Sequence, residues 1–207
     1  MTGYEVAKQT GISRSNAYNS LASMTEKGAA YLVEEGNTRK YVPVPVEEFC
    51  KNRIRRMEEA RQWLKIHVPS EKTHVEGYIT IEGARNILDK MRNLLDKVEQ
   101  RVYISCTRNY LLLLVRELEE LKRAGKKVVI VTDQPVTFSG AKVYVGKSRG
   151  MQIGVIADSR YVLTGEYGEG SMNTCLYSGQ KNFVELYKTA LGNEIKLLTI
   201  QEEKNKA

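Results

Sequence analysis

Near its start the chain reads TGYEVAKQTGISRSNAYNSLASMTEKG (residues 2–28), followed closely by YLVEEGNTRKYVPV (residues 31–44), and these two stretches decide its N-terminal fold. The first predicts two short helices, because Thr2 and Ser13 are favourable N-caps. Gly11 and Gly28 stand where glycine commonly ends a helix. The second predicts two strands around a Gly36-Asn37 turn. This order predicts a helix-turn-helix followed by a β-hairpin wing, a shape that can read duplex DNA.

The second predicted helix has one apolar face and one polar face. Ala17, Leu21 and Met24 follow at i, i+4 and i+7, so we expect them to face the core. Arginine can donate two hydrogen bonds to guanine and asparagine can pair with adenine, each such pair discriminating by roughly 1–3 kcal/mol. The wing carries cations suited to phosphate or a minor groove. The predicted DNA-binding residues are Ser13, Arg14, Ser15, Tyr18, Asn19, Arg39, Lys40 and Tyr41.

Two alternatives to this interpretation exist. A winged helix also serves as a protein-interaction module, in which the same polar helix is a solvated face and the module binds no DNA. Tyr18 and Tyr41 are equally well explained as packing residues, since both are large aromatic side chains in a small module.

Residues Val46 to Val68 predict one long charged helix with a heptad-like seam. Cys50, Ile54, Met57, Arg61, Leu64 and Val68 follow a 4-3-4-3-4 spacing, interrupted once by the polar Arg61. This spacing is typical of a two-stranded coiled coil and predicts a homodimer through Val46–Val68. The alternative is a helix that packs on its own domain. Pro69 ends the helix, and the polar stretch Ser70 to Glu76 predicts a hinge.

From Glu76 onward the pattern predicts a mixed α/β domain. Apolar runs suited to strands alternate with amphipathic helical stretches and then continue as hairpins, which favours a mixed sheet with helices on its faces. The predicted strands are 77–81, 101–106, 128–132, 142–145, 151–157, 161–164 and 174–177, and the predicted helices are 84–98, 111–124 and 181–198.

Composition narrows the classes of protein to consider. The 207 residues carry a net charge of +7 with 42% hydrophobic residues, which favours polyanionic partners and a real core. Cys50, Cys106 and Cys175 are far apart and only His67 and His74 supply imidazoles, so we expect reduced buried thiols and no metal site. No apolar run reaches 18 residues, so we expect no membrane span, and the cytoplasm is the default location.

The N-terminal motifs resemble those of the TrmB family of sugar-responsive transcription regulators. The resemblance rests on the turn Gly11 to Ser15 and on Tyr41-Val42-Pro43 leading through Glu47-Glu48 into a long helix. It is strong over residues 2–50 and weaker beyond. It implies a winged helix over 1–45, a dimerisation helix and hinge over 46–75, and a phospholipase D-like regulatory domain over 76–207. It also implies a homodimer on a palindromic operator and an effector, in some members a sugar.

The resemblance further implies one more helix ahead of Thr2, which would cover Val6, Ala7 and part of the Leu21 face. That helix has no counterpart in the 207 residues. We therefore expect Val6 and Ala7 to be poorly covered.

The chain departs from the catalytic pattern of phospholipase D enzymes, which is His-x-Lys-x4-Asp followed by Gly-Ser. In the best register, Met151 stands at the nucleophile position and Ile153 at the lysine position, whereas Asp158 and Gly165 match. Neither apolar side chain can attack phosphorus or neutralise phosphate charge. Glu166, where serine is expected, repels an anion. We therefore predict no enzyme, no catalytic residue and no cofactor, with Asp158 capping a turn; the alternative is a phosphodiesterase or nuclease with a DNA-targeting module.

Polar side chains follow three of the predicted strands at their carboxyl ends. Ligands of α/β sheets gather there, and a sugar needs hydrogen-bonding groups together with an aromatic face. The alternative is that these are ordinary polar loops. The predicted effector-binding residues are Arg108, Asn109, Asp133, Glu166 and Tyr167.

Overall fold

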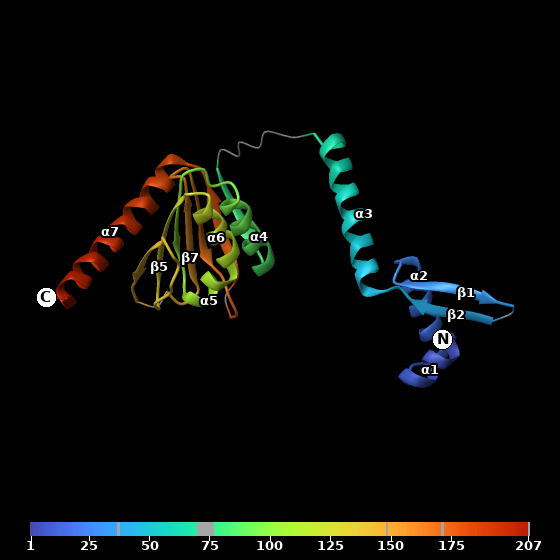
Figure 1. Ribbon diagram of the computed structural model, residues 1–207. Helices are drawn as coiled ribbons and strands as arrows, with labels where there is room; N and C mark the ends of the chain where they lie inside the picture. The colour runs from blue at the N-terminus through green and yellow to red at the C-terminus, as the bar shows by residue number, and fades with distance from the viewer. Residues whose placement is uncertain (37, 70–76, 148, 171, 207) are drawn as a thin grey trace. The chain divides into compact units, whose positions relative to one another are not determined.

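A computed structural model describes residues 1–36, 38–69, 77–147, 149–170 and 172–206. The chain divides into two compact units, Met1–Lys72 and Thr73–Ala207 (Figure 1). Asn37 of the predicted turn and the whole of the predicted hinge, Ser70 to Glu76 with His74 in it, lie outside the described residues. The finer division into three parts stays a prediction.

The first unit has the predicted order of helices and strands. Its elements are α1 (Gly3–Thr10), α2 (Arg14–Glu26), β1 (Ala30–Glu35), β2 (Thr38–Pro43) and α3 (Val46–His67). Thr2 and Glu5 form a reciprocal capping box at the start of α1. The Ser13 hydroxyl accepts from the Asn16 backbone N–H at 3.2 Å at the start of α2. Gly11 and Gly28 both adopt the left-handed conformation that ends a helix, with φ of 74° and 77°.

The core of the winged helix is small. Its buried hydrophobic residues are Ala7, Ala17, Leu21, Ala30 and Val44. The prediction was right for Ala17 and Leu21 but wrong for Met24, which is 43% exposed. Met24 is exposed because only the first two turns of α2 pack against the core. The expectation for Ala7 was also wrong, because Ala7 is only 6% exposed.

The second unit is a seven-stranded mixed sheet in the order β3-β9-β8-β7-β4-β5-β6. Strands β4, β5 and β6 are parallel, and the other neighbouring pairs are antiparallel. The strands are β3 (Tyr78–Glu82), β4 (Arg101–Ser105), β5 (Lys127–Thr132), β6 (Lys142–Val145), β7 (Gln152–Ala157), β8 (Tyr161–Glu166) and β9 (Thr174–Ser178).

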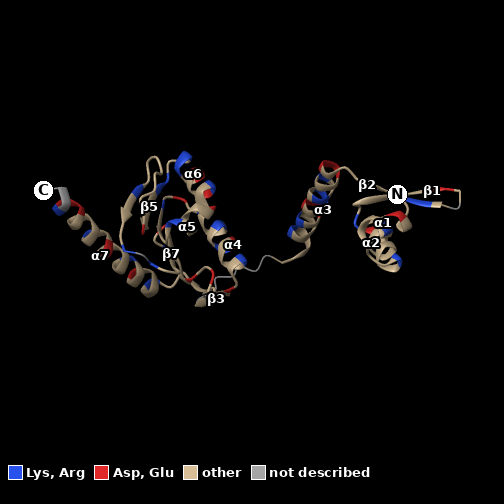
Figure 2. Cartoon of the chain, turned by 90° about the horizontal axis from the view of Figure 1, so that it is seen from below, with Lys and Arg blue, Asp and Glu red and all other residues tan. Residues whose placement is uncertain are grey.

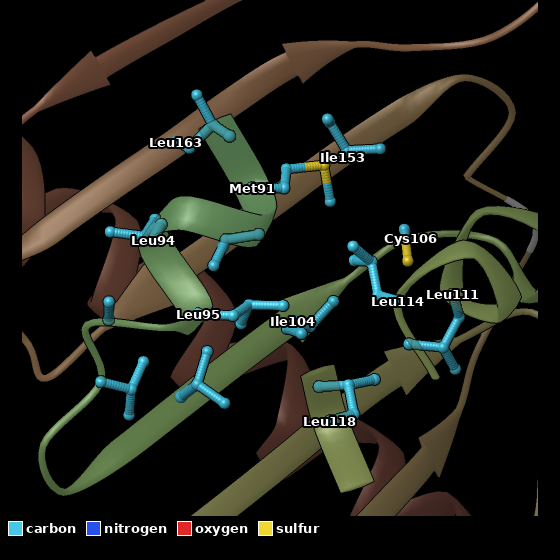
Figure 3. Packing of buried hydrophobic residues seen from close by; sticks show 14 of the residues in the cluster. Met91, Leu94, Leu95, Ile104, Cys106, Leu111, Leu114, Leu118, Ile153 and Leu163 are labelled. Atoms are coloured by element: carbon cyan, nitrogen blue, oxygen red, sulfur yellow. The ribbon is translucent and has the colours of Figure 1, made fainter. Parts of the chain in front are cut away.

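Helices cover both faces of this sheet. On one face α4 (Ala84–Leu95) and α6 (Val115–Arg123) pack over the larger apolar cluster, which includes Met91, Ile104 and Leu118 (Figure 3). On the other, α7 (Lys181–Lys206) packs over a smaller cluster. The single helix predicted over 111–124 is instead α5 (Arg108–Leu111), a 3-10 turn (Leu112–Leu114) and α6. The break in the helix lets both Leu111 and Leu114 be buried in the core. Helical periodicity in the sequence does not predict such a break.

The cysteines are free thiols, but they are not all buried. Cys106 and Cys175 lie in the core, where burial raises their pKa to about 12 and about 11. Cys50 lies on α3 and is exposed, because no side chain of α3 is buried within its own unit. The expectation of a buried thiol was therefore wrong for Cys50.

Candidate nucleic-acid interface

The residues predicted for the recognition helix lie on α2 and at its N-cap, Ser13, and all of them are exposed. Because Ala17 and Leu21 fill the core, Arg14, Ser15 and Asn19 are left exposed. The Arg14 guanidinium lies over the Tyr4 ring, 4.4 Å from its centroid, which holds this cation at the start of the helix. Positive charge and free amide groups at a helix N-terminus suit phosphate and base edges.

Tyr18 packs within the module and is also accessible on its surface, so its position fits both of the roles considered for it. Its ring lies so close to Gly3 that a Cβ there would stand 2.6 Å from it, so the ring packs against α1. Its side chain is nevertheless 42% exposed beside Arg14 and Asn19. Gly3 therefore positions an aromatic residue on the predicted DNA-reading surface.

The wing presents its cations in ion pairs. Arg39 Nε lies 3.2 Å from Glu34, and Lys40 Nζ lies 2.5 Å from Glu35, across the β1–β2 ladder. The hydrogen bond from Lys40 lowers the pKa of Glu35. Tyr41 is half-buried and exchanges backbone hydrogen bonds with Met1, so its role is partly structural. Exposed ion pairs are worth at most about 1 kcal/mol, so phosphate can compete for these cations.

The predicted effector residues share one edge of the sheet. β8 runs parallel to β4, since each pairs antiparallel with β7, and the carboxyl ends of β4, β5 and β8 therefore meet. Asp133 Oδ1 accepts from the Arg108 backbone N–H at 2.8 Å, so that carboxylate is used in holding a loop. Asn109 and Glu166 are exposed.

Tyr167 is buried and packs edge-on against Tyr110, with 5.0 Å between the ring centroids. The sequence reasoning missed Tyr110, which it placed in the loop just before its predicted helix. Its side chain also explains Gly168, where a Cβ would lie 1.8 Å from the Tyr110 hydroxyl oxygen. Tyr110 and Tyr167 therefore pack together at the edge of the sheet that the predicted effector residues share.

A groove of about 800 Å³ lies elsewhere, between α4 and the 112–120 segment. It is lined by polar and acidic side chains, by Arg92 and Arg116, and by the exposed Leu112 and Leu113. None of the five predicted effector residues lines this groove. The sequence offered no signal for it, because the groove follows from the broken helix.

The residues aligned with the phospholipase D pattern do not converge. Met151 precedes β7 and Asp158 follows it, so they lie at opposite ends of one strand. Ile153 is 1% exposed and belongs to the larger apolar cluster. Asp158 accepts from the backbone N–H groups of Glu99, Gln100 and Arg101 at 2.7–2.9 Å, so it holds the loop before β4 rather than its own turn.

Partial burial acts to raise the pKa of Asp158, but those three donors more than offset it, and the pKa is lowered. Within the described part of the chain, no group of three or more His, Cys, Asp or Glu side chains is placed to hold a metal ion. No helix in that part is long and apolar enough to cross a membrane.

Comparison with known proteins gives four matches. Residues 1–47 match the family model of the sugar-specific transcriptional regulator TrmB. The uncharacterized protein YrhO of Bacillus subtilis (strain 168) is 29% identical over 197 residues, which cover 94% of this chain and 66% of YrhO. The structure of TrmBL2, an archaeal chromatin protein, covers 95% of this chain and 86% of its own, with 17% identity and a TM-score of 0.51. NucT from Helicobacter pylori covers 58% of this chain and 97% of its own, with 13% identity and a TM-score of 0.47.

The fold and these matches define a winged-helix protein with an attached α/β domain, and the predicted fold class is confirmed. Within that class, residues 1–47 match the TrmB family model, which confirms the resemblance seen in the N-terminal part of the sequence. The chain spans just under two thirds of the length of YrhO.

Proposed function

We propose that the protein is a DNA-binding transcription regulator of the TrmB type. It binds a palindromic operator as a homodimer, and a small ligand, in the simplest case a sugar, modulates its affinity. The observation that carries the proposal is α2, whose inner face is buried while Arg14, Ser15, Tyr18 and Asn19 stay exposed. TrmBL2, which shares the fold, is described as binding DNA.

Within this proposal, the residues of α2 and the wing have different roles. Arg14 and Asn19 read base edges, and Ser13 and Ser15 contact phosphate together with the helix N-terminus. Arg39 and Lys40 leave their carboxylate partners for the DNA backbone. Loss of a base contact relaxes specificity, whereas loss of a phosphate contact weakens binding to all sequences.

Dimerisation through α3 is supported by the exposure of its seam. Ile54 and Met57 are 70% and 72% exposed, and Leu64 and Val68 are about half exposed. Apolar side chains in this spacing are stabilised when a second helix covers them. A dimer places two recognition helices on half-sites roughly 34–36 Å apart, so a ligand that rotates them changes operator affinity.

Fluorescence anisotropy with duplex DNA tests the proposal. The full chain and a version extended upstream are titrated with random-sequence duplexes and with selected operator candidates at several salt concentrations. We expect a salt-sensitive, sequence-preferring complex, weakened by Arg14→Ala and by Arg39→Ala, with sequence preference lost only for Arg14→Ala. The absence of such a complex with both versions contradicts the proposal. A thermal-shift screen with sugars and phosphosugars then identifies the ligand, because a ligand of the native state raises the melting temperature.

We further propose that the protein is not an enzyme, since apolar side chains stand where phosphodiester chemistry needs a nucleophile and a cation. Purified protein is expected to leave bis-p-nitrophenyl phosphate intact. Turnover that survives rigorous purification contradicts this and favours the phosphodiesterase alternative.

A further inference from the structure

The edge of the sheet opposite the predicted effector residues is strongly basic. Three segments meet there: the loop before β4, the connection from α6 to β5, and the turn between β7 and β8. We call this surface the basic edge, and its cations are Lys97, Arg101, Lys122, Arg123, Lys126, Lys127 and Arg160 (Lys and Arg are blue in Figure 2).

Hydrogen bonds tie these segments into one surface. Arg101 and Lys127 are partners in the parallel β4–β5 ladder, on strands about 4.8 Å apart. Lys126 Nζ donates to the Glu99 carbonyl oxygen, and the Asp158 carboxylate accepts from the backbone of 99–101. Arg160 and Lys127 are thereby held near the same loop.

Three acidic residues, Asp96, Glu99 and Asp158, lie in these segments and offset the seven cations only in part. Glu99 pairs with Arg160 at 3.5 Å in an exposed ion pair, and the charge of Asp158 is satisfied by three backbone N–H groups. Within the described part of the chain, Lys97, Arg101 and Lys127 have no carboxylate within 4.0 Å. The edge therefore carries an excess of positive charge in solution.

Local structure explains only part of this excess. Lys122 and Arg123 stand in the last turn of α6, where a cation stabilises a helix. Arg101 and Lys127 begin strands, so no helix dipole accounts for them, whereas Arg160 lies in a turn and pairs with Glu99. Cations that neither cap a helix nor pair with a carboxylate suit an external polyanion.

We propose that the basic edge is a second contact surface for the phosphate backbone of duplex DNA. The proposal rests on the DNA-binding function proposed for the winged helix. None of the described segments 97–101, 122–127 and 158–160 exposes a large apolar side chain, which favours phosphate over a membrane surface. Because one chain carries both surfaces, contact by the first raises the effective concentration of the second.

The test compares two triple variants of the full chain with equal net charge. The edge variant is Lys97→Gln, Arg101→Gln, Lys127→Gln. The control variant removes three exposed cations of the same unit that lie outside the basic edge, as Arg85→Gln, Lys181→Gln, Lys196→Gln. Binding to a long random-sequence duplex is measured by anisotropy at several salt concentrations, and circular dichroism melting verifies that all three proteins fold.

Each phosphate contact contributes about 0.9 to the slope of log K against log salt, so the edge variant is expected to lose about 2.7. Between about 50 and 200 mM salt, its Kd then rises about 40-fold less than that of the wild type. The control variant is expected to keep the wild-type slope. Lys97→Gln alone, on an exposed loop, is expected to reduce the slope by about 0.9 and serves if the triple variant misfolds.

Equal slopes for the edge variant and the wild type, or equal losses for both triple variants, overturn the inference while leaving the winged-helix proposal intact. Absence of any duplex binding by the wild type overturns both. If the edge variant loses affinity for phosphatidylglycerol vesicles but not for DNA, the surface serves a membrane and the inference is wrong.

Discussion

The α3 seam gives the sharpest prediction, because one helix offers a variant and its matched control. Ile54 lies on the seam and Ile66 lies on the opposite side of α3, and both are highly exposed, at 70% and 77%. Ile→Ala removes three carbon groups, worth about 0.8 kcal/mol each when buried, while favouring the helix itself. Scaled by the exposed fraction and counted for two copies, Ile54→Ala costs the dimer about 3 kcal/mol, or roughly 200-fold in Kd.

Sedimentation equilibrium across micromolar loading concentrations measures this effect. We expect the wild type and Ile66→Ala to dimerise with similar Kd, and Ile54→Ala to shift to monomer. The single tryptophan, Trp63, supplies the absorbance signal from the same helix.

Two results refute the reasoning. A monomeric wild type throughout this range shows that α3 does not pair. Equal weakening by Ile54→Ala and Ile66→Ala shows that the heptad spacing does not select the interface.

Three further outcomes follow from the described contacts. Asp158→Ala removes three hydrogen bonds and is expected to cost about 3 kcal/mol, against about 1 kcal/mol for Asp158→Asn, by urea unfolding at neutral pH. The pKa of Asp158 is lower in the folded state than in the unfolded state, where it is about 3.9. The stabilisation by its carboxylate is therefore present above the unfolded pKa and is lost as pH falls through the folded pKa, so the stability advantage of the wild type shrinks towards pH 3. An advantage that does not change with pH contradicts this. Gly165→Ala places a Cβ 2.2 Å from a carbonyl oxygen of β9 and is expected to lower the free energy of unfolding by more than about 3 kcal/mol in the same assay. The control Gly192→Ala, in open space on α7, is expected to be neutral or stabilising. Similar stability of the two variants is the opposing result. Glu34→Gln releases Arg39 from its ion pair and is expected to tighten DNA binding at low salt, and unchanged affinity means that the wing cation is not used.

Local signals in the sequence predicted much of the first unit. Thr2, Ser13, Gly11 and Gly28 act within one or two turns of the backbone, so their effect on helix boundaries is readable from neighbouring residues. Met24 was misplaced because periodicity gives a face but not how far along that face the packing partner extends. The break before α6 was missed for a similar reason, since it depends on the depth of the core beneath Leu111 and Leu114.

The features of the candidate sites also fall into two groups, those predicted from local sequence and those visible only in the folded chain. Residue identity at short spacing was enough to predict the winged-helix motif, the heptad spacing of α3 and the mismatch with the phospholipase D pattern. The side-chain contacts became visible only in the folded chain: Asp158 holds the 99–101 loop, Arg39 and Lys40 are paired with carboxylates, and Tyr110 lies against Tyr167. The basic edge also belongs to this second group. Its cations are spread over more than sixty residues, and only the order of strands in the sheet gathers them on one side.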